Sequence, residues 1–146
     1  MTQAIAIAPL QAGDTGPVVR LWERCGLTRP WNDPRADIAQ AMRGRESTIL
    51  VARCDGAVAA SVMVGHDGHR GWFYYLAVDP ALRGQGLGRR MVAEAEAWLA
   101  TRGVAKAMLL VRPENSAVHG FYAALGYQVE PRTLMTRWLD GRAAKP

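Results

Sequence analysis

The sequence contains little cysteine, and its two cysteines form no recognisable motif. Cys25 and Cys54 lack the spacing of a zinc site or a CxxC redox motif, so we expect reduced thiols and no metal. No apolar run approaches the roughly 18 residues that a membrane helix needs, and no basic leader opens the chain. These absences argue against a disulfide framework and a membrane association, and they predict a cytoplasmic protein.

Two common phosphate-binding motifs are also absent. Gly84, Gly86 and Gly88 follow the pattern G-x-G-x-G, so the last glycine of the dinucleotide fingerprint G-x-G-x-x-G would fall on Arg89. The nucleoside-triphosphate loop ends in Gly-Lys-Ser or Gly-Lys-Thr, which this sequence lacks. The glycine segment therefore indicates neither of these two ligand classes.

The net charge is +5, but the basic residues are dispersed and form no stripe with interleaved aromatics. A nucleic-acid-binding module is the function that this charge alone would suggest, and without such a stripe we expect no nucleic-acid partner. The densest basic cluster, Arg83, Arg89 and Arg90, lies in the glycine segment. This position favours a small phosphorylated ligand.

Apolar periodicity and turn residues divide the chain into a regular series of elements. We expect one domain over residues 1–146, with a core at about 3–139 and a polar tail at 140–146. The expected strands are 3–10, 47–53, 57–65, 72–78, 106–111 and 133–139, and the expected helices are 13–26, 33–42, 86–101 and 115–125. This order predicts an α/β fold with flanking helices and a mixed, mostly antiparallel sheet, in which 72–78 and 106–111 are parallel.

The glycine segment, "DPALRGQGLGRRM", joins the expected strand 72–78 to the helix that follows. Each glycine costs about 0.5 to 1 kcal/mol relative to alanine in regular structure, so the local geometry must require them. A helix N-terminus offers unpaired N–H groups and a partial positive charge, and glycines let an anion approach that backbone. The segment therefore predicts a phosphate site.

Two motifs resemble those of the GNAT family of N-acetyltransferases. Arg83, Gly86 and Gly88 match the pyrophosphate motif R/Q-x-x-G-x-G/A, after a strand that ends in Val78-Asp79-Pro80. The later stretch "NSAVHGFYAALGY" resembles the second signature, N-x-x-A-x-x-F/L-Y-x-x-x-G-F/Y, although its Ala117 stands one place early. The stretches "GLTRPWNDP" and "RGQGLG" are further similar to the ribosomal-protein N-terminal acetyltransferases, which are small single-domain bacterial members.

The resemblance implies that acetyl-CoA is the cosubstrate. The backbone N–H groups of the glycine loop would hold its pyrophosphate, and its pantetheine arm would lie between strands 72–78 and 106–111 like an added strand. In this arrangement Val78 pairs with the pantetheine amides, and Asn115 binds the same arm. The implied cofactor-binding residues are Leu76, Val78, Arg83, Gly84, Gln85, Gly86, Gly88, Arg89, Asn115 and Tyr122.

The implied reaction is attack by a neutral amine on the thioester. The Leu76 N–H would donate to the developing oxyanion, and Tyr122 would protonate the departing thiolate. Tyr122 is alternatively a core residue of an amphipathic helix. Leu110 stands where some relatives have a glutamate base, so we expect deprotonation through ordered water, with Tyr74 as a relay, or an amine that arrives partly neutral.

The acceptor side is expected to involve Trp31, Asn32, Asp33 and Tyr74. Asp33 could attract a cationic amine, but its position before Pro34 suits a helix cap better. Tyr74 follows the period of a strand and Tyr75 is its neighbour, so we expect only one of the two to face the ligand.

The resemblance thus predicts acetyl transfer to a primary amine of a small molecule or of a peptide or protein. A coenzyme-A-binding regulator without turnover is the alternative, because Leu110 is no base. Family members are often dimers through C-terminal strands, and the apolar residues of 133–139 suit a homodimer interface as well as an ordinary core strand.

Overall fold

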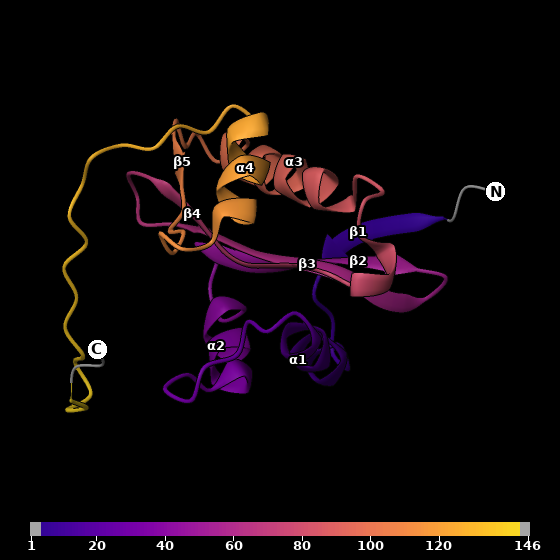
Figure 1. Cartoon of the computed structure of the whole chain (residues 1–146). Helices are drawn as coiled ribbons and strands as arrows, with labels where there is room; N and C mark the ends of the chain where they lie inside the picture. Colours follow the sequence, from indigo (N-terminus) through magenta and orange to yellow (C-terminus); the bar gives the residue numbers. More distant parts are fainter. Residues whose placement is uncertain (1–3, 144–146) are drawn as a thin grey trace. The chain divides into compact units, whose positions relative to one another are not determined.

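A computed structural model describes residues 4–143 (Figure 1). The predicted start of the first strand, Gln3, and the end of the predicted tail at 144–146 lie outside the described residues. The described chain forms two compact units that divide between Leu110 and Val111. Within residues 4–143, no helix has the length and apolar character needed to cross a bilayer.

The first unit is built on a five-stranded sheet whose strands follow one another in chain order. Its strands are β1 (Ile5–Pro9), β2 (Ser47–Cys54), β3 (Ala57–His66), β4 (Gly71–Val78) and β5 (Ala107–Met108). Neighbouring strands are antiparallel except β4 and β5, which are parallel. The prediction of a mixed, mostly antiparallel sheet is confirmed.

Helices cover both faces of this sheet (Figure 1). α1 (Thr15–Arg24) and α2 (Pro34–Ala41) lie on one face, and α3 (Leu87–Ala100) lies on the other. α1 buries Leu21 and Trp22 completely because these apolar residues share its sheet-facing side. α2 begins as predicted: the Asp33 carboxylate accepts from the N–H groups of Arg35 and Ala36, at 3.0 and 3.3 Å.

The second unit contains α4 (Ser116–Ala124), which begins where predicted. Asn115 Oδ1 accepts from the Val118 N–H at 3.3 Å and caps this helix. The predicted strand at 133–139 is wrong, because the described residues after α4 form no strand. Leu134 and Met135 are 62% and 88% exposed, so this segment does not bury the apolar side chains from which the strand was predicted.

β5 is also shorter than predicted. The expected strand 106–111 forms only at Ala107 and Met108, which pair with Gly71 and Trp72. A run of apolar residues does not specify where a neighbouring strand ends its pairing, so the sequence overestimated this element.

Gly71 permits close packing between the start of β4 and the end of α3. A Cβ at this position would stand 2.7 Å from Cδ2 of Leu99, whose side chain is buried. We therefore expect Gly71→Ala to lower the free energy of unfolding by about 1–3 kcal/mol through overpacking. Urea denaturation measures this loss, and Leu99→Val in the same chain should restore part of it. An unchanged midpoint would contradict this packing.

Candidate active site

A β-bulge interrupts β4 in the middle of the sheet. Ser61 pairs with Ala77 and Met63 pairs with Tyr74, so two residues of β4, Tyr75 and Leu76, stand opposite Val62 alone. Tyr75 has a positive φ of 52°, which is unusual for a residue with a large side chain. Bulges of this kind concentrate next to active sites, where they redirect side chains.

Side chains from two other elements fix the bulge. The Ser61 hydroxyl donates to the Tyr75 carbonyl at 3.0 Å and accepts from Trp22 Nε1 at 2.8 Å. The Trp22 ring also stacks on the Tyr75 ring, with centroids 3.8 Å apart and planes 5° apart. Trp22 and Ser61 are fully buried, so this network is dry and rigid.

The bulge places both tyrosines on the α1–α2 face. Tyr74 is directly opposite Met63, and cross-strand partners project to the same face. Met63 and Tyr75 both pack against the core that α1 and α2 form with the sheet. The expectation that Tyr74 and Tyr75 alternate across the strand is therefore wrong, because the inserted residue breaks the alternation. Which of the two faces a ligand stays a prediction.

One edge of β4 is open over the second half of the strand. β5 pairs with β4 only at Gly71 and Trp72, so no described strand pairs with that edge from Tyr74 to Val78. The Asp79 N–H donates to the Ala59 carbonyl at 2.8 Å. The backbone groups of Val78 therefore point away from β3, toward the open edge. This edge can accept an extended, peptide-like ligand.

The glycine loop follows the open edge and leads into α3. Gly84 and Gly86 have φ values of 79° and 80°, and no other atom lies within 4 Å of a Cβ built on either. Gly86 is the N-cap of α3 and supplies no side-chain cap, and the first turn contains no acidic residue. The first helical bond runs from the Arg90 N–H to the Gly86 carbonyl at 3.1 Å.

The N–H groups of the first helical turn, which include Gly88 and Arg89, therefore have no partner within the helix. Arg83, Gln85 and Arg89 are exposed around them. Arg24 pairs at 3.2 Å with the Asp79 carboxylate and offsets a negative charge next to the loop. Open space, free donors and positive charge together fit a pyrophosphate.

Trp31, Asn32 and Asp33, which were predicted for the acceptor side, lie in the loop between α1 and α2. The contact with β4 comes from Asp37, in the helical turn that follows. Asp33 uses its carboxylate to cap α2, whereas Asp37 Oδ2 accepts from the Tyr75 hydroxyl at 2.8 Å. Burial, and then the hydrogen bond to Asp37, raise the pKa of the Tyr75 phenol. Asp37 lies four residues after Asp33, and residues four apart lie on the same side of a helix. This spacing was the signal in the sequence that could have identified Asp37.

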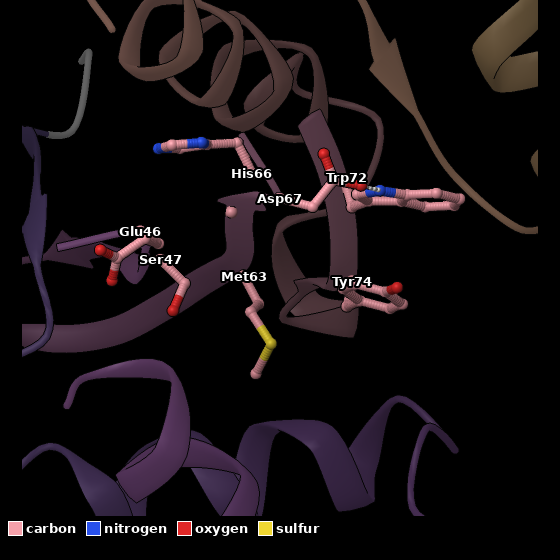
Figure 2. Close-up of a pocket in the computed structure, with 8 residues that line it drawn as sticks. Glu46, Ser47, Met63, His66, Asp67, Trp72 and Tyr74 are labelled. Carbon is pink, nitrogen blue, oxygen red and sulfur yellow. Dashed lines mark hydrogen bonds between the residues drawn. The ribbon is translucent and has the colours of Figure 1, made fainter. Parts of the chain in front are cut away.

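A pocket of about 230 Å³ adjoins Tyr74 on the same side of the sheet (Figure 2). The α2–β2 loop, β3 and β4 all contribute to it, and Met63 points toward the helices below (Figure 2). Tyr74 is 46% exposed and forms part of the wall. His66 is the last residue of β3, and His69 lies in the turn between β3 and β4.

Tyr122 and Asn115 belong to the second unit. The Tyr122 side chain is 8% exposed, and its ring meets those of Phe121 and Tyr127 edge to face, at centroid distances of 5.0 and 5.4 Å. Burial raises the pKa of Tyr122 to about 12, so the phenol keeps its proton at neutral pH. Asn115 is exposed, with its carbonyl oxygen used in the helix cap.

The Acetyltransferase (GNAT) family model matches residues 17–127, which include most of α1 and all of the bulged strand, the glycine loop and α4. The chain belongs to the GNAT family of acetyltransferases. The predicted family and fold class are thereby confirmed, and so is the prediction of an acetyltransferase.

Curated relatives and solved structures agree with this assignment. An acetyltransferase of Pectobacterium atrosepticum is 44% identical over 130 residues, which span 88% of this chain and 92% of that protein. The ribosomal-protein-S18-alanine N-acetyltransferase from Escherichia coli has a TM-score of 0.75 at 25% identity, covering 95% of this chain and 88% of its own. AAC(6′)-Iy, in complex with the bisubstrate analog CoA-S-monomethyl-acetylneamine, shares the fold with a TM-score of 0.79 at 17% identity, covering 92% and 98% of the two chains.

In this GNAT protein, the open edge of β4 at Leu76 and Val78 leads directly into the glycine loop, which contains the predicted pyrophosphate residues. Asp37 is the residue of this region that the sequence prediction omitted, and Tyr75 was considered there only as the alternative to Tyr74. Among residues 4–143, no group of His, Cys, Asp and Glu side chains has an arrangement that could hold a metal ion.

Proposed function

We propose that this GNAT protein transfers the acetyl group of acetyl-CoA to a primary amine of a small molecule or of a peptide or protein. The observation that carries the proposal is the continuity of the open β4 edge with the donor-rich glycine loop, which fits a pantetheine arm and a pyrophosphate in succession. The CoA-containing bisubstrate analog bound by AAC(6′)-Iy supports the choice of cosubstrate. We place this activity in the cytoplasm and in a single domain.

Each part of the cosubstrate has a counterpart among the predicted residues. The N–H groups of Gly84, Gly86, Gly88 and Arg89 bind the pyrophosphate, and the exposed Arg83 and Gln85 border the same loop. The Val78 backbone pairs with the pantetheine amides. Its carbonyl already accepts from the Cys25 thiol at 3.3 Å, which leaves one lone pair for a ligand. Asn115 has its amide NH₂ available for the same arm.

Acetyl-CoA supplies the acetyl group as an activated thioester. The amine nitrogen forms a bond to the acetyl carbon, and the bond from that carbon to sulfur breaks. The Leu76 N–H donates to the acetyl oxygen as negative charge develops there. Tyr122 gives its proton to the departing sulfur and recovers one from solvent.

The amine must lose a proton during the reaction, and the Asp37 carboxylate is joined to β4 by the hydroxyl of Tyr75, the neighbour of Leu76. The proton leaves through water on the α1–α2 side, where Trp31 and Asn32 line the approach and the Tyr75 hydroxyl holds the Asp37 carboxylate. The sequence suggested Tyr74 as the proton relay, and we assign this role to the Tyr75–Asp37 pair instead.

A pair of tyrosine variants separates these two roles. Tyr75→Phe keeps the ring that stacks on Trp22 but releases Asp37, so we expect the KM for the amine to rise about three- to tenfold, the equivalent of losing one hydrogen bond. The KM for acetyl-CoA should stay near the parental value. Steady-state kinetics measure both. Tyr74→Phe is the matched control and should leave the kinetics with a monoamine acceptor unchanged, because phenylalanine keeps the ring. An effect in Tyr74→Phe alone would instead identify Tyr74 as the relay.

Thiol release over a panel of amines, amino acids, antibiotics and N-terminal peptides tests the proposed function, with each product confirmed by mass spectrometry. We expect acetylated product with at least one class of acceptor. Saturable binding of coenzyme A without any product would instead identify a regulator, the role that Leu110 suggested. Size-exclusion chromatography of the same preparation tests for the homodimer that the family resemblance suggested.

A further inference from the structure

The pocket beside Tyr74 lies a short distance along β4 from the proposed reaction site. Tyr74 and Trp72 precede Leu76 by two and four residues, so at about 3.3 Å per residue they stand at most about 7 and 13 Å from it along the strand, and the bulge at Tyr75 shortens both separations. Both line the pocket, which opens on the same side of the sheet as Tyr75. A group that extends from the reacting amine can reach it.

The pocket has an aromatic wall. The rings of Trp72 and Tyr74 have centroids 6.5 Å apart and planes only 15° apart, and they project from β4 side by side (Figure 2). Tyr74 is 46% exposed, which is high for a large aromatic in the middle of a strand. Electron-rich ring faces attract ammonium and guanidinium groups.

The charges around the pocket have one sign. Glu46 and Asp67 contribute carboxylates, and no lysine or arginine is among the residues that line the pocket. The His66 ring turns away toward Trp98 of α3, with ring centroids 6.2 Å apart. The Asp67 side chain is fixed: Oδ1 accepts from the N–H groups of Arg70 and His69, at 2.8 and 2.9 Å, and Oδ2 accepts from Trp72 Nε1 at 3.4 Å. These backbone hydrogen bonds, that from Arg70 first, hold the pKa of Asp67 below its usual value. Asp67 therefore keeps a negative charge beside the aromatic wall.

We infer that this pocket binds a second cationic group of the acceptor, so that the preferred acceptors are amines that carry a further positive charge within about 13 Å of the acetylated nitrogen. The inference rests on the proposed acetyl transfer and names its substrate class. Trp72 and Tyr74 provide the face for the cation, and Asp67 and Glu46 provide the opposite charge. An uncharged extension would gain only the apolar contact.

Matched acceptors test the inference. We compare 1,5-diaminopentane with pentylamine, which has the same carbon chain but one amine, and expect kcat/KM for the diamine to be about 5 to 30 times higher, as one cation–π contact and one ion pair would give. Asp67→Asn should reduce this ratio about threefold or more, mainly through KM. The hairpin should survive, because Asn-Gly is a favoured turn pair. Glu46→Gln provides a second, independent variant.

Asp55→Asn is the control, since it makes the same change in the β2–β3 turn, outside the pocket, and should keep the parental ratio. Equal kcat/KM values for the two probes, or a ratio that neither pocket variant changes, would overturn the inference while leaving acetyl transfer intact. Calorimetric titration of the full chain with both probes measures the preference without turnover. Loss of product with every acceptor would reject the proposed function, and the titration would still decide whether the pocket selects the dication.

Discussion

Turnover of Tyr122→Phe is expected to fall about a hundredfold or more, whereas its affinity for acetyl-CoA should change little. Phenylalanine retains the ring that meets Phe121 and Tyr127 and removes only the proton donor. A general acid typically contributes between about a hundredfold and ten-thousandfold. Rescue by water would place the loss near the lower end of this range.

The pKa of Tyr122 determines the pH range over which its phenol can donate a proton. Because burial raises its pKa from 10.0 to about 12, the folded chain favours the neutral phenol. Its contribution to stability is therefore fully present below pH 10 and is lost as the pH rises through about 12. We expect no loss of activity from Tyr122 ionisation between pH 6 and pH 9, and this can be read from the kcat profile.

Tyr127→Phe is the matched control, because it removes a phenol from the same unit and keeps the ring. Melting temperature, coenzyme A affinity and turnover should be measured on one preparation of each variant. A structural role for Tyr122 would appear as a folding defect with normal turnover per folded molecule. If Tyr122→Phe stayed folded, bound acetyl-CoA and turned over at the parental rate, solvent would be the acid.

Gly86→Val is expected to weaken coenzyme A binding about ten- to a hundredfold, the range for losing a charge-assisted hydrogen bond or two. The valine side chain would occupy the open space over the loop, where a pyrophosphate must approach the backbone. It would also strain a residue whose φ is 80°, at a cost of about 1–2 kcal/mol in stability. Calorimetric titration with coenzyme A measures the affinity.

Gly56→Val separates these two effects. Gly56 has a φ of 82° and equally open surroundings, but it lies in the turn between β2 and β3. We expect a similar loss of melting temperature and unchanged coenzyme A binding. Arg90→Ala should also bind normally, since the proposed contacts are made by the loop backbone. Parental affinity in Gly86→Val would show that the pyrophosphate binds elsewhere.

Local sequence patterns were sufficient for most of the fold. The predicted strand 57–65 and helix 86–101 differ from β3 and α3 by only one residue at an end, because alternation or helical spacing defines each body and glycines or turn residues mark its limits. The helix caps at Asp33 and Asn115 were predicted correctly for the same local reason, since a capping side chain bonds the backbone two or three residues ahead.

The sequence by itself determined the family and the glycine loop, because the loop acts through backbone geometry that the glycines encode directly. Tertiary structure decided the other side of the site. The bulge at Tyr75 depends on Ser61 and Trp22, which lie on β3 and α1, and the partner of its hydroxyl is Asp37 on α2. The failed strand at 133–139 has the same explanation: a strand, a bulge and a pocket each need partners from distant parts of the chain, and a local pattern does not say where those partners are.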